Sequence, residues 1–332
     1  MEMQRNITGL PLSPATQEPA AQEQEPAAQE EEACLLGQRS LRKYLDYVDD
    51  MVVGGKELNR AALVDEWRAA SDYFFDLEES EANFADTVDV RDLDPALQPL
   101  AEAVESDSRF RRTFDVLPTR FAMVELDKLI VSQSHVNLDH GRRLQARLGA
   151  APTPEKLFKF CQPLDRKETP VNVRKTGSKR YMFWSQSSDL RFLEAALLDP
   201  AQIKKYDSFG PLGGAVGLMV GFGSNFLNVI QSDKRLLIHN GHHRAYALRA
   251  LGITHAPCII QTVTRRAELG LVASPEVADA PEFYFASARP PMLKDFFDAK
   301  IRKVMRVQRI MRVIELSFEV KDYEVRDFAL TD

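Results

Sequence analysis

Three of the six histidines of this chain lie within five residues of one another, in the segment LLIHNGHHRAYALRALG over 236–252. They are His239, His242 and His243. They surround Gly241, and Arg244 follows them directly. Imidazoles bind metal ions and exchange protons near neutral pH, and a guanidinium forms paired hydrogen bonds with phosphate oxygens. Three interpretations therefore compete: a metal site, a phosphate-binding turn, or a turn whose polar residues only cap a helix.

The residues around the histidines predict a hairpin, a glycine turn, a helix and a further strand. Ala245, Leu248 and Leu251 recur at helical spacing, and Gly252 stands where a helix C-terminal glycine is expected. Gly241 permits a left-handed backbone at the turn. The expected elements are strands over 226–230 and 235–238, a helix over 242–251 and a strand over 253–263. The histidine segment is thus predicted to open a helix.

A helix N-terminus favours an anion, because its first N–H groups are unpaired and the helix dipole is positive there. The phosphate-binding interpretation follows from this position. The residues predicted to hold phosphate are His239, Asn240, Gly241 and Arg244. His242 and His243 are the predicted catalytic residues, because an imidazole can act as a general acid or base.

The metal interpretation has less support from the residue types. No cysteine or paired carboxylate stands near the histidines in the sequence to complete the four-ligand set that zinc prefers. The letters HNGHH have a superficial likeness to an HNH nuclease, but the further Asn and His of that site have no recognisable match in this chain. A metal-dependent nuclease stays as a less favoured alternative. No metal ligand is assigned from the sequence.

Two segments together resemble the ParB/sulfiredoxin-like superfamily. LLIHNGHHRAYALRALGITHAPCIIQTV is similar to its second characteristic box, in which a strand runs into G-x-x-R and an alanine-rich helix, and VELDKLIVSQSHVNLDH is similar to its opening box. The resemblance implies an α+β fold with a mixed core, and a nucleoside di- or triphosphate bound with Mg²⁺ at the 239–244 turn. Catalysis there would be phosphoryl transfer or nucleotide hydrolysis. Glu125, Asp127 and Asn137 of the opening box would be secondary contacts to metal or nucleotide.

The G-H-H-R form of this chain departs from the best-known members of the superfamily. His242 stands where ParB proteins have the glutamate of G-E-R-R, and where sulfiredoxins have the reactive cysteine of G-C-H-R. The resemblance therefore implies a divergent variant that lacks sulfinic-acid chemistry. It leaves open whether the chain is a phosphotransferase or a hydrolase.

Charge and composition divide the chain into four predicted parts. Residues 1–33 carry seven glutamates and a single arginine, which account for the whole net charge of −6. Such a segment buries too little apolar surface to fold. The predicted parts are a disordered acidic tail over 1–37, a helical region over 38–118, a core over 119–265 with an insertion at about 141–220, and a C-terminal helix and strand extension over 266–332.

Two further segments carry specific predictions. SSDLRFLEAALLDP, over 187–200, has helical spacing and predicts a helix within the insertion. KIRKVMRVQRIMR, over 300–312, has six basic residues and predicts a helix with a basic face, whereas 313–321 alternates like a half-buried strand. The basic run supports an alternative function, a non-catalytic regulatory module that binds nucleic acid or a protein partner.

The overall composition is that of a globular protein, with 44% hydrophobic and 28% charged residues and no apolar run long enough to span a membrane. The first residues lack a signal-peptide pattern, so a cytoplasmic location without a membrane partner is expected. The three cysteines are odd in number and far apart, which argues against a disulfide framework and against a zinc finger.

Overall fold

The central sheet of the molecule has five strands in the order β10-β9-β11-β3-β2. Its strands are β2 (Val90–Asp92), β3 (Thr119–Glu125), β9 (Asn228–Ser232), β10 (Arg235–Asn240) and β11 (His255–Val263). Strand β11 is antiparallel to β3 and parallel to β9. Nearly every residue of β11 is buried, so both faces of the sheet are covered. A continuous apolar run such as APCII is what such a strand requires.

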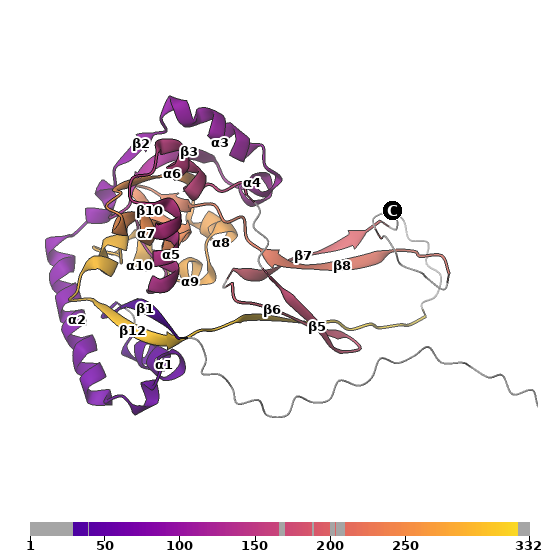
Figure 1. Cartoon of the computed structure of the whole chain (residues 1–332), viewed down its shortest axis with the longest axis horizontal. Coiled ribbons are helices and arrows are strands. Elements are labelled where there is room, and N and C mark those ends of the chain that lie inside the picture. The colour runs from indigo at the N-terminus through magenta and orange to yellow at the C-terminus, as the bar shows by residue number, and fades with distance from the viewer. Residues whose placement is uncertain are drawn as a thin grey trace, which may run out of the picture.

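The computed structural model describes residues 29–38, 40–165, 170–187, 189–199, 203 and 210–324. Helices and several small sheets together make an α+β fold. Figure 1 shows a body that holds the central sheet and most helices, and two thin sheets that project from it as an arm. The arm consists of the sheet β13-β6-β5 and the hairpin β7-β8.

Helices cover the central sheet on the side of the histidine turn. They are α5 (Leu138–Leu148), α6 (Pro154–Cys161) and α7 (His242–Ala250). Apolar residues of α5 and α7 join those of the sheet in the largest core cluster, where Leu248, Ile238 and Val124 are fully buried. The hairpin, helix and strand predicted around the histidines are all present. In the opening segment, β4 spans His135–Asn137.

The predicted helical region contains four α-helices and the short strand β2. They are α1 (Leu41–Met51), α2 (Arg60–Ser80), α3 (Gln98–Glu105) and α4 (Ser108–Thr113), with 3-10 turns at Gly55–Glu57, Phe84–Thr87 and Pro95–Leu97. After β11 the chain forms short helices before the last strands. These are Arg266–Glu268, α8 (Leu269–Val272), α9 (Pro275–Asp279), α10 (Pro281–Phe285) and Leu293–Phe297.

The prediction of a disordered tail over 1–37 is wrong at its end, because Gln29–Leu35 forms strand β1. This strand lies between β12 (Arg302–Gln308) and β4. Glu31 faces Arg306 across the pair, and Ala33 is completely buried. Glu31 pairs with Arg142 at 2.9 Å, and Glu30 lies 3.7 Å from Arg143 and from Arg309. The acidic residues thus find basic partners more than 100 positions later in the chain, which local composition cannot reveal. Residues 1–28 lie outside the described part.

Two predicted helices are strands in the structure. The segment SSDLRFLEAALLDP contains β7 (Leu190–Leu198), which pairs with β8 (Ala215–Phe222). Strand β8 occupies much of a glycine-rich stretch over 210–223. The basic run 300–312 contains β12 and the start of β13 (Arg312–Ser317). Met305 and Val307 are buried while Arg306 is exposed, so the actual period is two. Pairing with distant strands has overridden the helical spacing of both segments.

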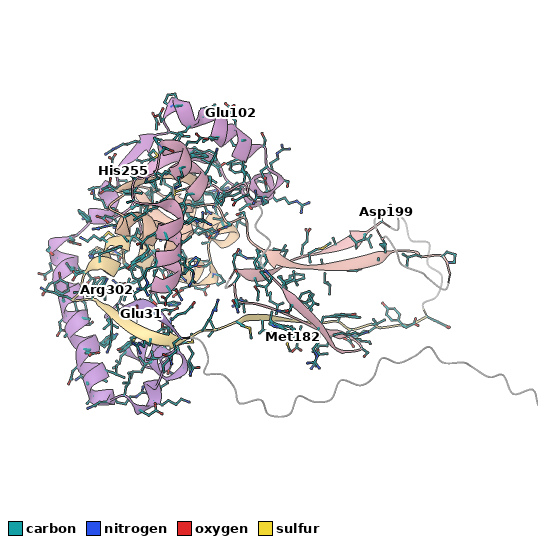
Figure 2. All side chains as sticks on the ribbon, in the orientation of Figure 1. Glu31, Glu102, Met182, Asp199, His255 and Arg302 are labelled. Atoms are coloured by element: carbon teal, nitrogen blue, oxygen red, sulfur yellow. The ribbon has the colours of Figure 1, made fainter. Side chains whose placement is uncertain are left out.

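The strand predicted over 313–321 is confirmed only in its first half. In β13, which pairs with β6 (Arg180–Ser185) and through it with β5 (Asn172–Gly177), Ile314 and Leu316 are half-buried. Phe318 and Val320 lie beyond the strand and are exposed. In Figure 2, Met182 marks this projecting sheet.

Candidate functional site

A glycine turn joins β10 to α7 and places the histidine segment at the helix start. Gly241 has a φ of 99°, and a Cβ atom there would lie 2.6 Å from Cδ1 of Leu227, which is itself fully buried. Only glycine meets both conditions without strain. In the part of the chain that the structure describes, no side chain caps the N-terminus of α7. The turn therefore leaves the first N–H groups of the helix without side-chain partners.

Five of the six histidines gather at this turn. They are His135 of β4, His140 of α5, His239 of β10, and His242 and His243 of α7. The His140 and His243 rings meet edge to face, with centroids 5.1 Å apart. His135 and His140 were not predicted as site residues. Both stand in the opening segment, about 100 positions before the turn, and the packing of α5 against α7 brings them in.

His243 connects two elements through its ring. Its Nε2 accepts a hydrogen bond from the backbone N–H of Asn137, at 3.1 Å. Burial, with His140 next and His242 after it, lowers the pKa of His243 to about 3. The ring is therefore neutral at neutral pH and carries its proton on Nδ1. This holds the start of α5 against α7, and the predicted acid–base role has no support in these contacts.

His242 is buried and incompletely paired. Burial above all, then His239 and His135, lower its pKa to about 3. Its side chain is 8% exposed, and its Nε2 has no hydrogen-bond partner among the described residues. A buried polar atom without a partner costs free energy, and native structures rarely keep one without a reason.

Arg244 has a different role from the predicted phosphate contact. Its guanidinium is buried and donates to the carbonyl oxygens of Cys161 and Asn225, each at 2.7 Å, and also to Oδ1 of Asn225. Cys161 ends α6 and Asn225 precedes β9, so they stand at the two ends of the segment that forms most of the arm. The assignment of Arg244 to phosphate is therefore corrected: its donors hold the base of the arm.

His239 and Asn240 lie at a bulge at the end of β10. The register of β10 on β9 shifts between Ile238 and Asn240, so His239 has no partner position opposite it. By surface area His239 is exposed and Asn240 is half-buried. The His239 ring nevertheless lies among enough protein atoms to lose part of its hydration, and this desolvation, followed by the charge of Arg191, lowers its pKa. The charge of Arg191 thus acts on the ring of His239.

Arg191 is an accessible guanidinium that the sequence did not indicate. It belongs to β7 of the arm, its side chain is 53% exposed, and it pairs with Asp189. The helix predicted for this segment gave no reason to place it beside the histidines. The guanidinium that is accessible to a ligand is therefore that of Arg191, because the Arg244 guanidinium is buried and donates hydrogen bonds inside the body.

Two of the three secondary candidates lie away from the turn. Oε2 of Glu125 accepts from the backbone N–H of Asp89 at 2.9 Å and pairs with Lys128 at 3.1 Å. Asp127 pairs with Arg249, which is in the last turn of α7, whereas the histidines are at its first. Neither carboxylate is brought to the site.

Asn137 is at the site, but its side chain is already used. Its Oδ1 accepts from the backbone N–H of His140 and so caps α5, and its Nδ2 donates to Glu30 at 2.6 Å. Its contribution is to position α5 and, through its own N–H, the ring of His243.

The residues do not fit a metal centre. Within the described ranges, no group of three or more histidine, cysteine, aspartate or glutamate side chains is placed to hold a metal ion. The histidines meet edge to face or through backbone groups instead of converging. The three cysteines, Cys34, Cys161 and Cys258, are all buried, and none of them is joined to another in a disulfide bond.

Comparison with protein-family models, with curated proteins and with solved structures gives no match. The similarity to the ParB/sulfiredoxin-like superfamily thus stays a prediction from the two sequence segments. None of the described helices is both long and apolar enough to cross a membrane.

Proposed function

We propose that this chain binds the phosphate groups of a nucleotide at the N-terminus of α7, between the body and the base of the arm. The observation that carries the proposal is the buried His242 Nε2 without a partner beside an uncapped helix start. Free N–H groups and the positive end of the helix dipole favour an anion. A phosphate there offers acceptor oxygens to these donors.

The accessible side chains at the turn supply the remaining recognition. His239 is exposed at the bulge, and Arg191 lies close enough for its charge to influence the pKa of that histidine. A guanidinium and an imidazole can both donate to phosphate oxygens. Mg²⁺ accompanying the nucleotide would neutralise phosphate charge, and no residue set of this chain is assigned to it.

The proposed function is binding without an assigned bond-making step. The two histidines predicted to be catalytic have pKa values near 3 and are neutral at neutral pH. A general acid or base works best with a pKa near the operating pH. The site therefore resembles a recognition module more than a phosphotransferase or hydrolase. A bound nucleotide would contact the arm through Arg191, which belongs to β7.

The binding test uses two exposed residues, so that loss of affinity is not loss of folding. We expect ATP, ADP, CTP or GTP, with or without Mg²⁺, to raise the melting temperature of the wild type. A ligand at a hundred times its Kd adds about 2.7 kcal/mol of stability. Arg191→Gln and His239→Asn should each weaken binding about tenfold, as expected for one hydrogen bond to a charged group.

The matched control for this test is His255→Asn. His255 is the one histidine outside the cluster, pairs with Asp89 and is labelled in Figure 2. Its variant should bind nucleotide like the wild type. Equal affinity in the wild type, Arg191→Gln and His239→Asn would show that the nucleotide binds elsewhere, and no stabilisation by any nucleotide would reject the proposal.

A second candidate function is favoured by the arm. The sheet β13-β6-β5 projects from the body (Figure 1) and carries exposed basic residues on all three strands and on the turn between β5 and β6. They are Arg174, Lys175, Lys179, Arg180 and Arg312. A β-ribbon with these basic residues fits the groove of a nucleic-acid duplex. Of the basic run over 300–312, which the sequence predicts as the contact with nucleic acid or a protein, only Arg312 belongs to this sheet.

Salt dependence tests the second candidate. If the ribbon contacts phosphates, the affinity for a labelled DNA duplex should fall steeply between about 50 and 200 mM salt. Arg174→Gln combined with Lys175→Gln should reduce the slope of log K against log salt by about 2. Fluorescence anisotropy measures both quantities. A flat salt dependence, or an unchanged slope in the double variant, would exclude this contact.

A further inference from the structure

A concave site lies in the body, away from the histidine turn. It is a cavity of about 330 Å³ bounded by α3, α5 and α6 and by the residues that follow α6. Its walls are mostly apolar, with Leu100 and Val104 from α3, Leu148 from α5, and Phe158 and Phe160 from α6. Small-molecule sites commonly have this size and lining, with a few polar groups that set orientation.

Gln162 provides a polar group in the wall. Its side chain is 1% exposed, and its Nε2 donates to the carbonyl oxygens of Leu227 at 2.9 Å and of Pro257 at 3.0 Å. Because both partners are acceptors, the other amide atom is the oxygen. That Oε1 is buried and has no partner among the residues that the structure describes. It is an acceptor suited to a hydroxyl or N–H on a ligand.

The lining of the cavity is positively charged. Arg147, Lys156 and Lys159 contribute to it, against the single carboxylate of Asp165. Lys159 pairs with Glu155 at 2.5 Å, whereas within the described ranges neither Arg147 nor Lys156 has an ion-pair partner. Arg147 stacks over the ring of Phe160, 5.1 Å from its centroid. Two cations beside an apolar wall attract an anion with an apolar body.

We propose that this cavity binds a small amphipathic anion: an apolar chain or ring system that carries a carboxylate for Arg147 and Lys156, and a hydrogen-bond donor for Oε1 of Gln162. The apolar body, the carboxylate and the hydrogen-bond donor of the ligand are each complementary to a separate feature of the wall: its apolar side chains, its two cations and the unpaired Oε1 of Gln162. The site is independent of the nucleotide proposal, because it shares no residue with the α7 turn.

The test uses ω-hydroxydecanoate as the probe and the corresponding neutral diol as its matched analogue, both followed by isothermal titration calorimetry on the full chain. We expect one molecule of the hydroxy acid to bind per chain, and the diol to bind at least fivefold more weakly because it lacks the carboxylate. Lys156→Gln should weaken the hydroxy acid about fivefold and leave the diol unchanged.

Two matched substitutions locate the binding. Leu100→Trp places a larger side chain at the half-buried wall and should weaken the hydroxy acid more than tenfold, whereas Leu271→Trp, at a residue that is 66% exposed on α8, should have no effect. His239→Asn should also bind like the wild type, which separates this site from the turn. Absence of saturable binding, or undiminished binding by Leu100→Trp, would overturn the proposal.

Discussion

Replacing Arg244 with methionine is expected to lower the free energy of unfolding by about 3 kcal/mol, because the carbonyl oxygens of Cys161 and Asn225 lose their buried donors. Methionine fills much of the volume, so the loss reports the missing hydrogen bonds more than a cavity. Urea unfolding of wild type and variant measures the difference.

Arg249→Met is the matched control, on the same helix. The Arg249 side chain is 36% exposed and pairs with Asp127 at 2.7 Å, so its removal should cost less than about 1 kcal/mol. If Arg244→Met were as stable as the wild type but had lost nucleotide affinity, the guanidinium would be a phosphate ligand and its assignment to the base of the arm would be wrong.

Acid is expected to destabilise the protein through His242 and His243. Each has a pKa near 3 when folded and about 6.5 when unfolded. Between these values the unfolded chain binds more protons, so stability is full above pH 6.5 and is lost as the pH falls. At about pH 5 the loss is roughly 2 kcal/mol for each histidine, or about 4 kcal/mol for both.

The double variant His242→Leu with His243→Gln tests the source of this loss. Leucine removes an unpaired Nε2, and glutamine can still accept from the N–H of Asn137, so the variant should fold at neutral pH. Between neutral pH and about pH 5, urea unfolding should show a markedly smaller loss of stability than in the wild type. A loss equal to that of the wild type would place the pH sensitivity in other groups. His255→Asn serves as the control outside the cluster.

The local pattern around Gly241 was sufficient to predict the hairpin, the helix and the strand after it, because each depends on neighbours in sequence. Strands β1, β7 and β12 could not be predicted in this way. From the sequence, the glutamates of β1 resemble a solvated tail, because β12, whose Arg306 lies opposite Glu31, is distant in the chain. The β7 segment has helical spacing, and it forms a strand because it pairs with β8. Their secondary structure depends on partners that are distant in sequence.

In the candidate site, too, some residues could be predicted from local sequence and others could not. The glycine turn and its three histidines follow from one segment, whereas His135, His140 and Arg191 come from three other elements and meet them only in the folded chain. The role of Arg244 is the clearest case. In a sequence its charge suggests phosphate, but in the structure it donates to the carbonyl oxygens of Cys161 and Asn225 and to Oδ1 of Asn225.

The central claim is that nucleotide phosphate binds at the first turn of α7, and magnetic resonance of the assigned backbone amides and histidine rings tests it most directly. On titration with the nucleotide that stabilises the protein most, the amide signals of Gly241, His242 and His243 and the ring signals of His239 and His242 should shift and saturate together. The ring of His255 should stay unchanged. Saturable shifts elsewhere, with these signals unmoved, would contradict the claim.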